Sequence, residues 1–186
     1  MSSANPSLLT PAEYLALERK SETRSEYING RVYAMSGASR RHSLIAGNLF
    51  REISTQLRDK PCEVHMTDMR VKVDPTGMYT YPDIAAVCGE AQFEDSLIDT
   101  LLNPTVIIEV LSPSTEAYDR GEKFAHYRRL ESLREYVLVA QDKIRIEHYR
   151  RDGDQWIFSE AGDTLDLPAI DCHVGVAAIY EKVVFE

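Results

Sequence analysis

The chain has 186 residues, 44% of them hydrophobic and 27% charged, a composition that predicts one globular domain spanning residues 1–186. Its 30 acidic and 21 basic side chains give a net charge of −9, which argues against nucleic-acid binding over the whole surface but allows a local basic groove. No run of about 18 apolar residues occurs, and residues 1–10 lack the basic and apolar segments of a secretory signal, so the sequence predicts neither a membrane span nor secretion.

The first part of the chain predicts a helix followed by a hairpin. Residues 8–19 form the helix, with Thr10 as its N-cap and Glu13 completing a capping box. Residues 27–33 form the hairpin, because its Asn-Gly pair tolerates the positive φ angles of a type I′ turn.

The middle of the chain predicts a second helix and three strands. Residues 40–58 carry apolar side chains at helical spacing. Residues 64–73 and 81–88 predict two antiparallel strands, with a turn at residues 74–77 between them. Residues 105–111 are almost continuously apolar, as in a strand covered on both faces, and we expect this strand at the centre of the sheet.

The last part predicts a helix, three more strands and a short terminal helix. Asp119 is the expected N-cap of a helix over residues 120–130. The strands follow at residues 135–140, 143–150 and 155–159, and the terminal helix near residues 176–181. Together the elements predict an α/β fold, in which helices flank a central mixed β-sheet that has an antiparallel extension.

The cysteine pattern favours a cytoplasmic protein. Cys62, Cys88 and Cys172 lie far apart and form no CxxC pair and no zinc-binding spacing. An odd number of cysteines argues against a disulfide framework, and disulfides are rare in reducing compartments.

Three groups of arginines could belong to a local basic groove, although such groups are more often solvated surface. They are Arg40 with Arg41, Arg128 with Arg129, and Arg145 with Arg150 and Arg151. The sequence leaves both interpretations open.

Two acidic residues on apolar strands are the main candidates for a functional site. Glu109 lies inside the most apolar strand, where a carboxylate is costly unless it is paired, hydrogen-bonded or bound to a metal. A salt bridge to an arginine such as Arg70 is the structural alternative. Asp83 follows Pro82 at the start of another apolar strand, where it is either a turn residue or a second ligand. Two such carboxylates suit Mg²⁺, and a bound metal can promote phosphodiester hydrolysis.

The pair formed by Pro82-Asp83 and Glu109-Val110-Leu111 resembles the PD-(D/E)XK nuclease motif. In particular, the chain resembles the bacterial Uma-type family, a former domain of unknown function whose members are described as restriction endonucleases. The resemblance extends over nearly the whole chain. Its further pieces are Thr10 to Tyr14, Glu26 to Gly30, His42, Ser112 to Thr115, Asp119, and Lys123 to Tyr127.

This resemblance implies a restriction-endonuclease-like fold and cleavage of nucleic acid, most often DNA, that depends on Mg²⁺, for which Mn²⁺ can substitute. It implies that Asp83 and Glu109 bind the metal and that the main-chain carbonyl of Val110 is a further ligand. A homodimer is expected because two DNA strands need two cuts.

The sequence departs from the motif at Leu111, where the motif has a lysine. The expected replacement is Lys123, at the start of the following helix, with Tyr127 on the same helix face four residues later. The alternative is that Lys123 is a solvated surface lysine, in which case catalysis would be impaired.

Glu26 and His42 are accessory candidates, as a third carboxylate and a possible base. Their alternatives are a surface strand residue and a hydrogen-bonded core or capping histidine. Three functions stay open: an active DNA endonuclease, a catalytically inactive module for DNA binding or dimerisation, and an enzyme acting on RNA or structured DNA. Any recognition of a target sequence is expected from loops such as residues 89–103.

Overall fold

The structure, a computed structural model, describes residues 8–185. Most of the segment in which we found no secretory signal, residues 1–7, lies outside the described residues. Across residues 8–185, none of the helices combines the length and the apolar character that crossing a membrane requires.

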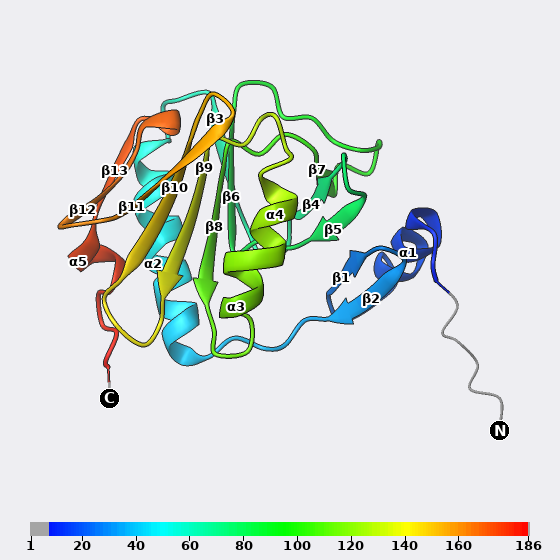
Figure 1. Ribbon diagram of the computed structural model, residues 1–186, viewed down its shortest axis with the longest axis horizontal. Coiled ribbons are helices and arrows are strands. Elements are labelled where there is room, and N and C mark those ends of the chain that lie inside the picture. The colour runs from blue at the N-terminus through cyan, green and yellow to red at the C-terminus, as the bar shows by residue number, and fades with distance from the viewer. Residues whose placement is uncertain (1–7, 186) are drawn as a thin grey trace.

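A six-stranded mixed sheet forms the centre of the fold (Figure 1). Its order is β11-β10-β9-β8-β6-β3, with β8 parallel to β9 and antiparallel to β6. The strands are β3 (Cys62–Met66), β6 (Ile84–Cys88), β8 (Val106–Leu111), β9 (Glu135–Ala140), β10 (Ile146–Asp152) and β11 (Gln155–Glu160). Every residue of β8 is buried, so the predicted central strand is confirmed.

Helices cover both faces of this sheet, as Figure 1 shows. On one face α2 (Arg40–Gln56) packs through Ile45, Leu49 and Ile53, which are fully buried. On the other face lies the helix that runs from Glu116 to Tyr127. Because adjacent strand residues point to opposite faces, β8 contributes side chains to both cores.

A second sheet of five short strands lies beside the first, in the order β2-β1-β5-β4-β7. Its hairpin turn has the predicted positive φ angles, 49° at Asn29 and 84° at Gly30. The capping box at Thr10 is also confirmed. The elements are α1 (Pro11–Glu18), β1 (Ser25–Ile28), β2 (Arg31–Ala34), β4 (Arg70–Val73), β5 (Met78–Thr80) and β7 (Thr100–Leu101).

The predicted strand over residues 64–73 is wrong as a single element. Its first part belongs to β3 in the large sheet and its second part to β4 in the small one. A turn separates them, in which the Met69 amide bonds to the Met66 carbonyl. Residues 74–77 consequently connect β4 to β5. Apolar residues alternate at positions 62, 64 and 66 and again at 69, 71 and 73, so the phase shifts by one residue at Thr67-Asp68. This shift was the signal of the change of sheet, and the prediction of one strand overlooked it.

The third helix begins earlier than predicted and is irregular. It comprises α3 (Glu116–Tyr118), a π-helical turn (Asp119–Lys123) and α4 (Phe124–Tyr127). Asp119 is therefore inside the helix and is buried, so the prediction that it caps the helix is wrong. A single turn of π-helix inside an α-helix frequently marks a functional site.

The C-terminal part confirms the short helix and adds a hairpin that the sequence analysis missed. Its strands are short and pair only with each other, next to α2. The elements are β12 (Thr164–Leu167), a 3₁₀ turn (Pro168–Ile170), β13 (Cys172–Gly175) and α5 (Val176–Ile179).

Cys62 and Cys88 form a disulfide, contrary to the expectation from the cysteine count. The two residues lie opposite each other on β3 and β6, with Cα atoms 4.0 Å apart. Cys172 stays free and buried. Strand pairing brought together cysteines that are 26 residues apart, which spacing motifs cannot detect. The cysteine pattern therefore no longer supports a cytoplasmic location, which stays a prediction.

Candidate metal centre and active site

Strand pairing brings the two candidate carboxylates to the same edge of the large sheet. Ile84 on β6 lies opposite Ile108 on β8 in an antiparallel register. Extending this register by one residue sets Asp83 opposite Glu109. Side chains in directly opposed positions have Cβ atoms about 4.5–5.5 Å apart, a spacing at which two carboxylates can share one cation.

The Asp83 carboxylate is buried and held on two sides. Its Oδ2 accepts a hydrogen bond of 2.7 Å from the Val110 amide and lies 3.1 Å from Nε2 of His42. Ser39 caps α2 by accepting from the His42 amide, which fixes this histidine at the first turn. Burial opposes the charged imidazole, but the hydrogen bond and charge of Asp83 outweigh it and raise the pKa of His42.

The Glu109 carboxylate is paired with Lys123. Its Oε1 lies 3.0 Å from the Lys123 ammonium and accepts a hydrogen bond of 2.9 Å from the Tyr127 hydroxyl. A salt bridge to Arg70, the structural alternative, is not formed, because the Arg70 guanidinium pairs with Asp99 at 2.9 Å.

Lys123 is buried, so the interpretation as a surface lysine is wrong. It is 5% exposed, and its ammonium also lies 3.0 Å from Oε1 of Glu26 and 3.7 Å from Oδ1 of Asp119. Leu111 points into the apolar core on the same face of β8 as Glu109. The helix over this face thus supplies the cation that the strand lacks.

The charges in this cluster do not balance. Burial disfavours the ammonium of Lys123, but the surrounding acids, Glu109 and Glu26 among them, raise its pKa well above the usual value. Burial, followed by the charges of Asp119 and Asp83, raises the pKa of Glu109 against the opposing effect of Lys123. The cluster therefore holds more acidic than basic side chains, and a bound cation would favour the ionised form of Glu109.

The sequence model of the Uma2 family, described as "Putative restriction endonuclease", matches residues 11–176. The chain belongs to this family. Two relatives in the cyanobacterium Synechocystis sp., uncharacterized proteins sll1609 and slr1290, are 37% and 36% identical to it. The alignments cover 84% and 95% of this chain and 89% and 94% of the relatives.

The fold is similar to that of a crystal structure described as "a putative nuclease belonging to DUF820" from Anabaena variabilis. The TM-score is 0.75 at 18% identity, with 95% of this chain and 99% of the other covered. The predicted restriction-endonuclease-like α/β fold is confirmed by this match and by the family assignment.

The candidate residues surround one cavity of about 1030 Å³. Its lining includes Glu26, His42, Asp83, Glu109, Val110 and Lys123. Tyr127 does not line the cavity but lies behind Glu109, to which it donates its hydrogen bond. Tertiary structure thus brings the candidate site residues together at one cavity, with Tyr127 directly behind Glu109.

Three polar residues at the cavity were not predicted as part of the site. Asp119 faces Lys123, and Tyr118 lies beside it in the lining. Gln141 donates a hydrogen bond of 2.8 Å to the Leu111 carbonyl. The signal available in the sequence was the spacing of four residues between Asp119 and Lys123, but the place of Asp119 before a helical pattern favoured a capping role.

The loop that was expected to read a target sequence is not part of this cavity. The lining includes none of residues 89–103. It includes residues 33–39, before α2, and residues 112–115, after β8, instead. Contacts that select a substrate are therefore expected from these two segments.

The donor set fits a hard cation such as Mg²⁺. Asp83 and Glu109 bring two carboxylates together, and the main chain of Val110 lies beside them. Within residues 8–185, no group of three or more His, Cys, Asp or Glu side chains is arranged to hold a metal. Mg²⁺ usually binds one or two carboxylates of the protein, and water and substrate phosphate complete its coordination.

Proposed function

We propose that this protein is a Mg²⁺-dependent endonuclease that hydrolyses phosphodiester bonds of DNA. The observation that carries the proposal is the Lys123 ammonium, 3.0 Å from Glu109 and buried in the same cavity as Asp83. It places a cation beside the second carboxylate, where the motif lysine is replaced by Leu111. The surplus of acidic side chains around it supports metal binding.

Each side chain has a role that follows from its contacts. Asp83, Glu109 and the Val110 carbonyl would hold the ion, which supplies positive charge at the phosphoryl group and lowers the pKa of a water. Lys123 stabilises the negative charge that develops on the phosphoryl oxygens. The hydroxyl of Tyr127 orients Glu109, as the Val110 amide orients Asp83.

A nucleic-acid substrate is supported by the basic side chains around the cavity. Arg24 and Arg41 belong to its lining, and Arg41 is part of one of the arginine groups seen in the sequence. Arginines so placed attract the phosphate backbone even when the net charge of the protein is negative. DNA is the proposed substrate, and an RNA duplex and a DNA junction in the same assay test the alternatives.

The test is cleavage of supercoiled plasmid with Mg²⁺ or Mn²⁺. Asp83→Asn is expected to lower the rate by at least about 100-fold, because it removes one of two charged ligands. Asp154→Asn, which neutralises an exposed carboxylate in the β10–β11 turn, is the matched control and should cleave like the wild type. Equal rates for wild type and Asp83→Asn, or cleavage in the presence of EDTA, would contradict the proposal.

A catalytically inactive module for DNA binding or dimerisation is the competing proposal. The burial of Leu111 in the apolar core favours it, because the motif position itself holds no cation. DNA binding without cleavage under any metal condition would select this alternative.

We also propose a homodimer. Tyr136, Val137 and Val139 of β9 are buried and cannot face a partner. Ile157 and Phe158 support the proposal instead, since they are 42% and 51% exposed on the edge strand β11. A monomer by light scattering at micromolar concentration would refute it.

A further inference from the structure

A second cavity, of about 640 Å³, lies at the opposite edge of the large sheet from Asp83 and Glu109. Thr105 and Arg134 reach it where β8 and β9 begin, whereas Glu109 lies near the end of β8. At about 3.3 Å per residue, the six residues of β8 separate the two edges by roughly 15–20 Å. This cavity is therefore distinct from the proposed active site.

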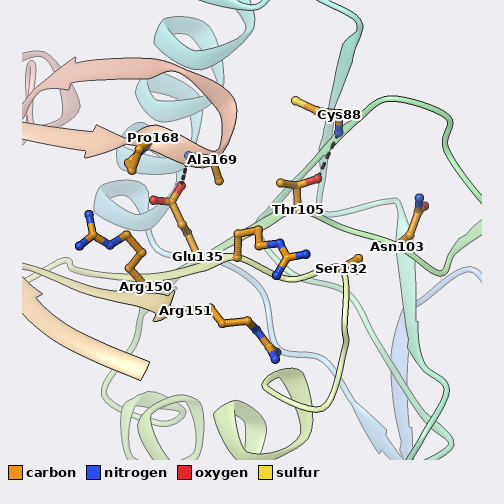
Figure 2. A pocket seen from close by; sticks show the side chains of 10 residues that line it. Cys88, Asn103, Thr105, Ser132, Glu135, Arg150, Arg151, Pro168 and Ala169 are labelled. Atoms are coloured by element: carbon orange, nitrogen blue, oxygen red, sulfur yellow. Dashed lines mark hydrogen bonds between the residues drawn. The ribbon is translucent and has the colours of Figure 1, made fainter. Parts of the chain in front are cut away.

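Three arginines line this second cavity, and Figure 2 shows Arg150 and Arg151 among its side chains. Within residues 8–185, Arg134 and Arg150 form no ion pair and no side-chain hydrogen bond, and both are exposed. A pair of arginines left without partners at one cavity indicates that they are available to an anion.

Arg151 adds a fixed guanidinium to the same cavity. Its Nε and Nη2 donate to the carbonyls of Leu133, Leu130 and Arg128, and its guanidinium lies 4.8 Å from the centre of the Trp156 ring. Burial, and then the charge of Arg134, lower the pKa of Arg151. Arg134 and Arg151 therefore bring like charges to one cavity, and an anion bound there would offset them.

One carboxylate oxygen of the acidic residue in this cavity is hydrogen-bonded within the protein, and the other lies beside a histidine without a hydrogen bond. Glu135 is fully buried; its Oε2 accepts from the Ala169 amide, as Figure 2 shows, and its Oε1 lies 3.3 Å from Nε2 of His148. In contrast, the Ser132 hydroxyl at the cavity is buried with no hydrogen-bond partner within residues 8–185. Ser132 is thus a donor that a bound anion could satisfy.

We propose that this cavity binds a phosphate monoester of nucleotide size. Guanidinium groups match the oxygens of a phosphate in geometry as well as charge. The volume lies within the range of about 300–1000 Å³ that is usual for small-molecule sites. Pro168 and Ala169 lie side by side and add apolar surface to the lining, which suits a planar base (Figure 2). The separation from the active site makes a small ligand a better match than the backbone of a DNA bound there.

The inference goes beyond the proposed nuclease function and is tested by calorimetric titration of the full chain with AMP in EDTA. Wild type is expected to bind AMP saturably, inorganic phosphate more weakly, and adenosine not measurably. The double variant Arg134→Ala/Arg150→Ala should weaken AMP binding at least about tenfold. Both side chains are exposed and unpaired, so the variant should keep the wild-type melting temperature.

The control variant Arg31→Ala/Lys143→Ala also removes two positive charges, but from exposed positions that do not line the cavity. It should bind AMP like the wild type. Asp83→Asn should also bind AMP normally, so failure of the nuclease proposal would leave this result unaffected. No saturable binding up to about 10 mM AMP, or equal binding by the Arg134/Arg150 variant, would overturn the proposal. It would also be overturned if a single-stranded oligonucleotide bound far more tightly than AMP through the same two arginines.

Discussion

At the scale of single residues, the burial of Lys123 contradicts the alternative that it is a solvated surface lysine. A long side chain with its charged end between Glu109 and Glu26 cannot be removed without leaving buried carboxylates unpaired. Loss of Lys123 is therefore expected to lower the melting temperature by more than the loss of a surface lysine would. Its stability and catalytic effects must be measured separately.

Lys123→Ala is expected to lower plasmid cleavage by at least about 100-fold, because a positioned cation is lost from the developing phosphoryl charge. It should also reduce the free energy of unfolding by about 3–5 kcal/mol at neutral pH, since one partner of a buried ion pair is removed. Cleavage kinetics and urea denaturation measure the two effects. Lys123→Met fills the same space, and Lys143→Ala is the exposed control. A Lys123→Met protein that is folded and cleaves at the wild-type rate would exclude a catalytic role.

At the scale of elements, the β3–β6 pair joins an edge strand to the strand that begins beside Asp83. The disulfide between Cys62 and Cys88 connects these strands covalently. Thiol titration in denaturant without reductant should therefore find one free thiol per chain, Cys172. A result of three thiols would show that the pair is reduced in the purified protein.

Cys62→Ser is expected to lower the free energy of unfolding under non-reducing conditions by about 2–4 kcal/mol, the usual contribution of a native disulfide. Denaturation of the variant and of the wild type, each with and without reductant, measures it. The wild type with reductant should resemble the variant, and reductant should not change the variant further. Equal stability of all four samples would show that the disulfide does not stabilise the fold.

At the scale of the whole molecule, a metal that binds only the folded state should stabilise it by mass action. Millimolar Mn²⁺ is expected to raise the melting temperature of the wild type, because Asp83 and Glu109 then share a cation that favours the ionised form of Glu109. Thermal denaturation with Mn²⁺ titrated in measures the shift, and Asp83→Asn should lose most of it. No shift in the wild type would contradict the metal site.

A single transition in the same experiment is expected if residues 1–186 form one domain. The two sheets share no strand. However, Glu26 on β1 of the small sheet contacts Lys123 on the helix over the large sheet, so the site itself links them. Two separate transitions would show that the sheets unfold independently.

Local sequence predicted those features whose causes are local. Thr10 and Glu13 bond to each other across one helical turn, and Asn29-Gly30 adopts its turn within a four-residue strand pair. The apolar run of β8 required burial on both faces wherever the strand was placed. Asp119 shows the limit of prediction from local sequence. An acidic residue before a helical pattern resembles an N-cap, whether or not the helix begins there.

By itself, the sequence determined the α/β class, the central strand, and Asp83 and Glu109 as acids on apolar strands. Only the tertiary structure decided which basic side chain lies beside these two acids. Whether Lys123 reaches Glu109 or solvent depends on how its helix packs across β8, and whether Cys62 meets Cys88 depends on which strands pair. Contacts between distant segments are selected by the packing of the whole chain, so neither spacing nor periodicity of residues can specify them.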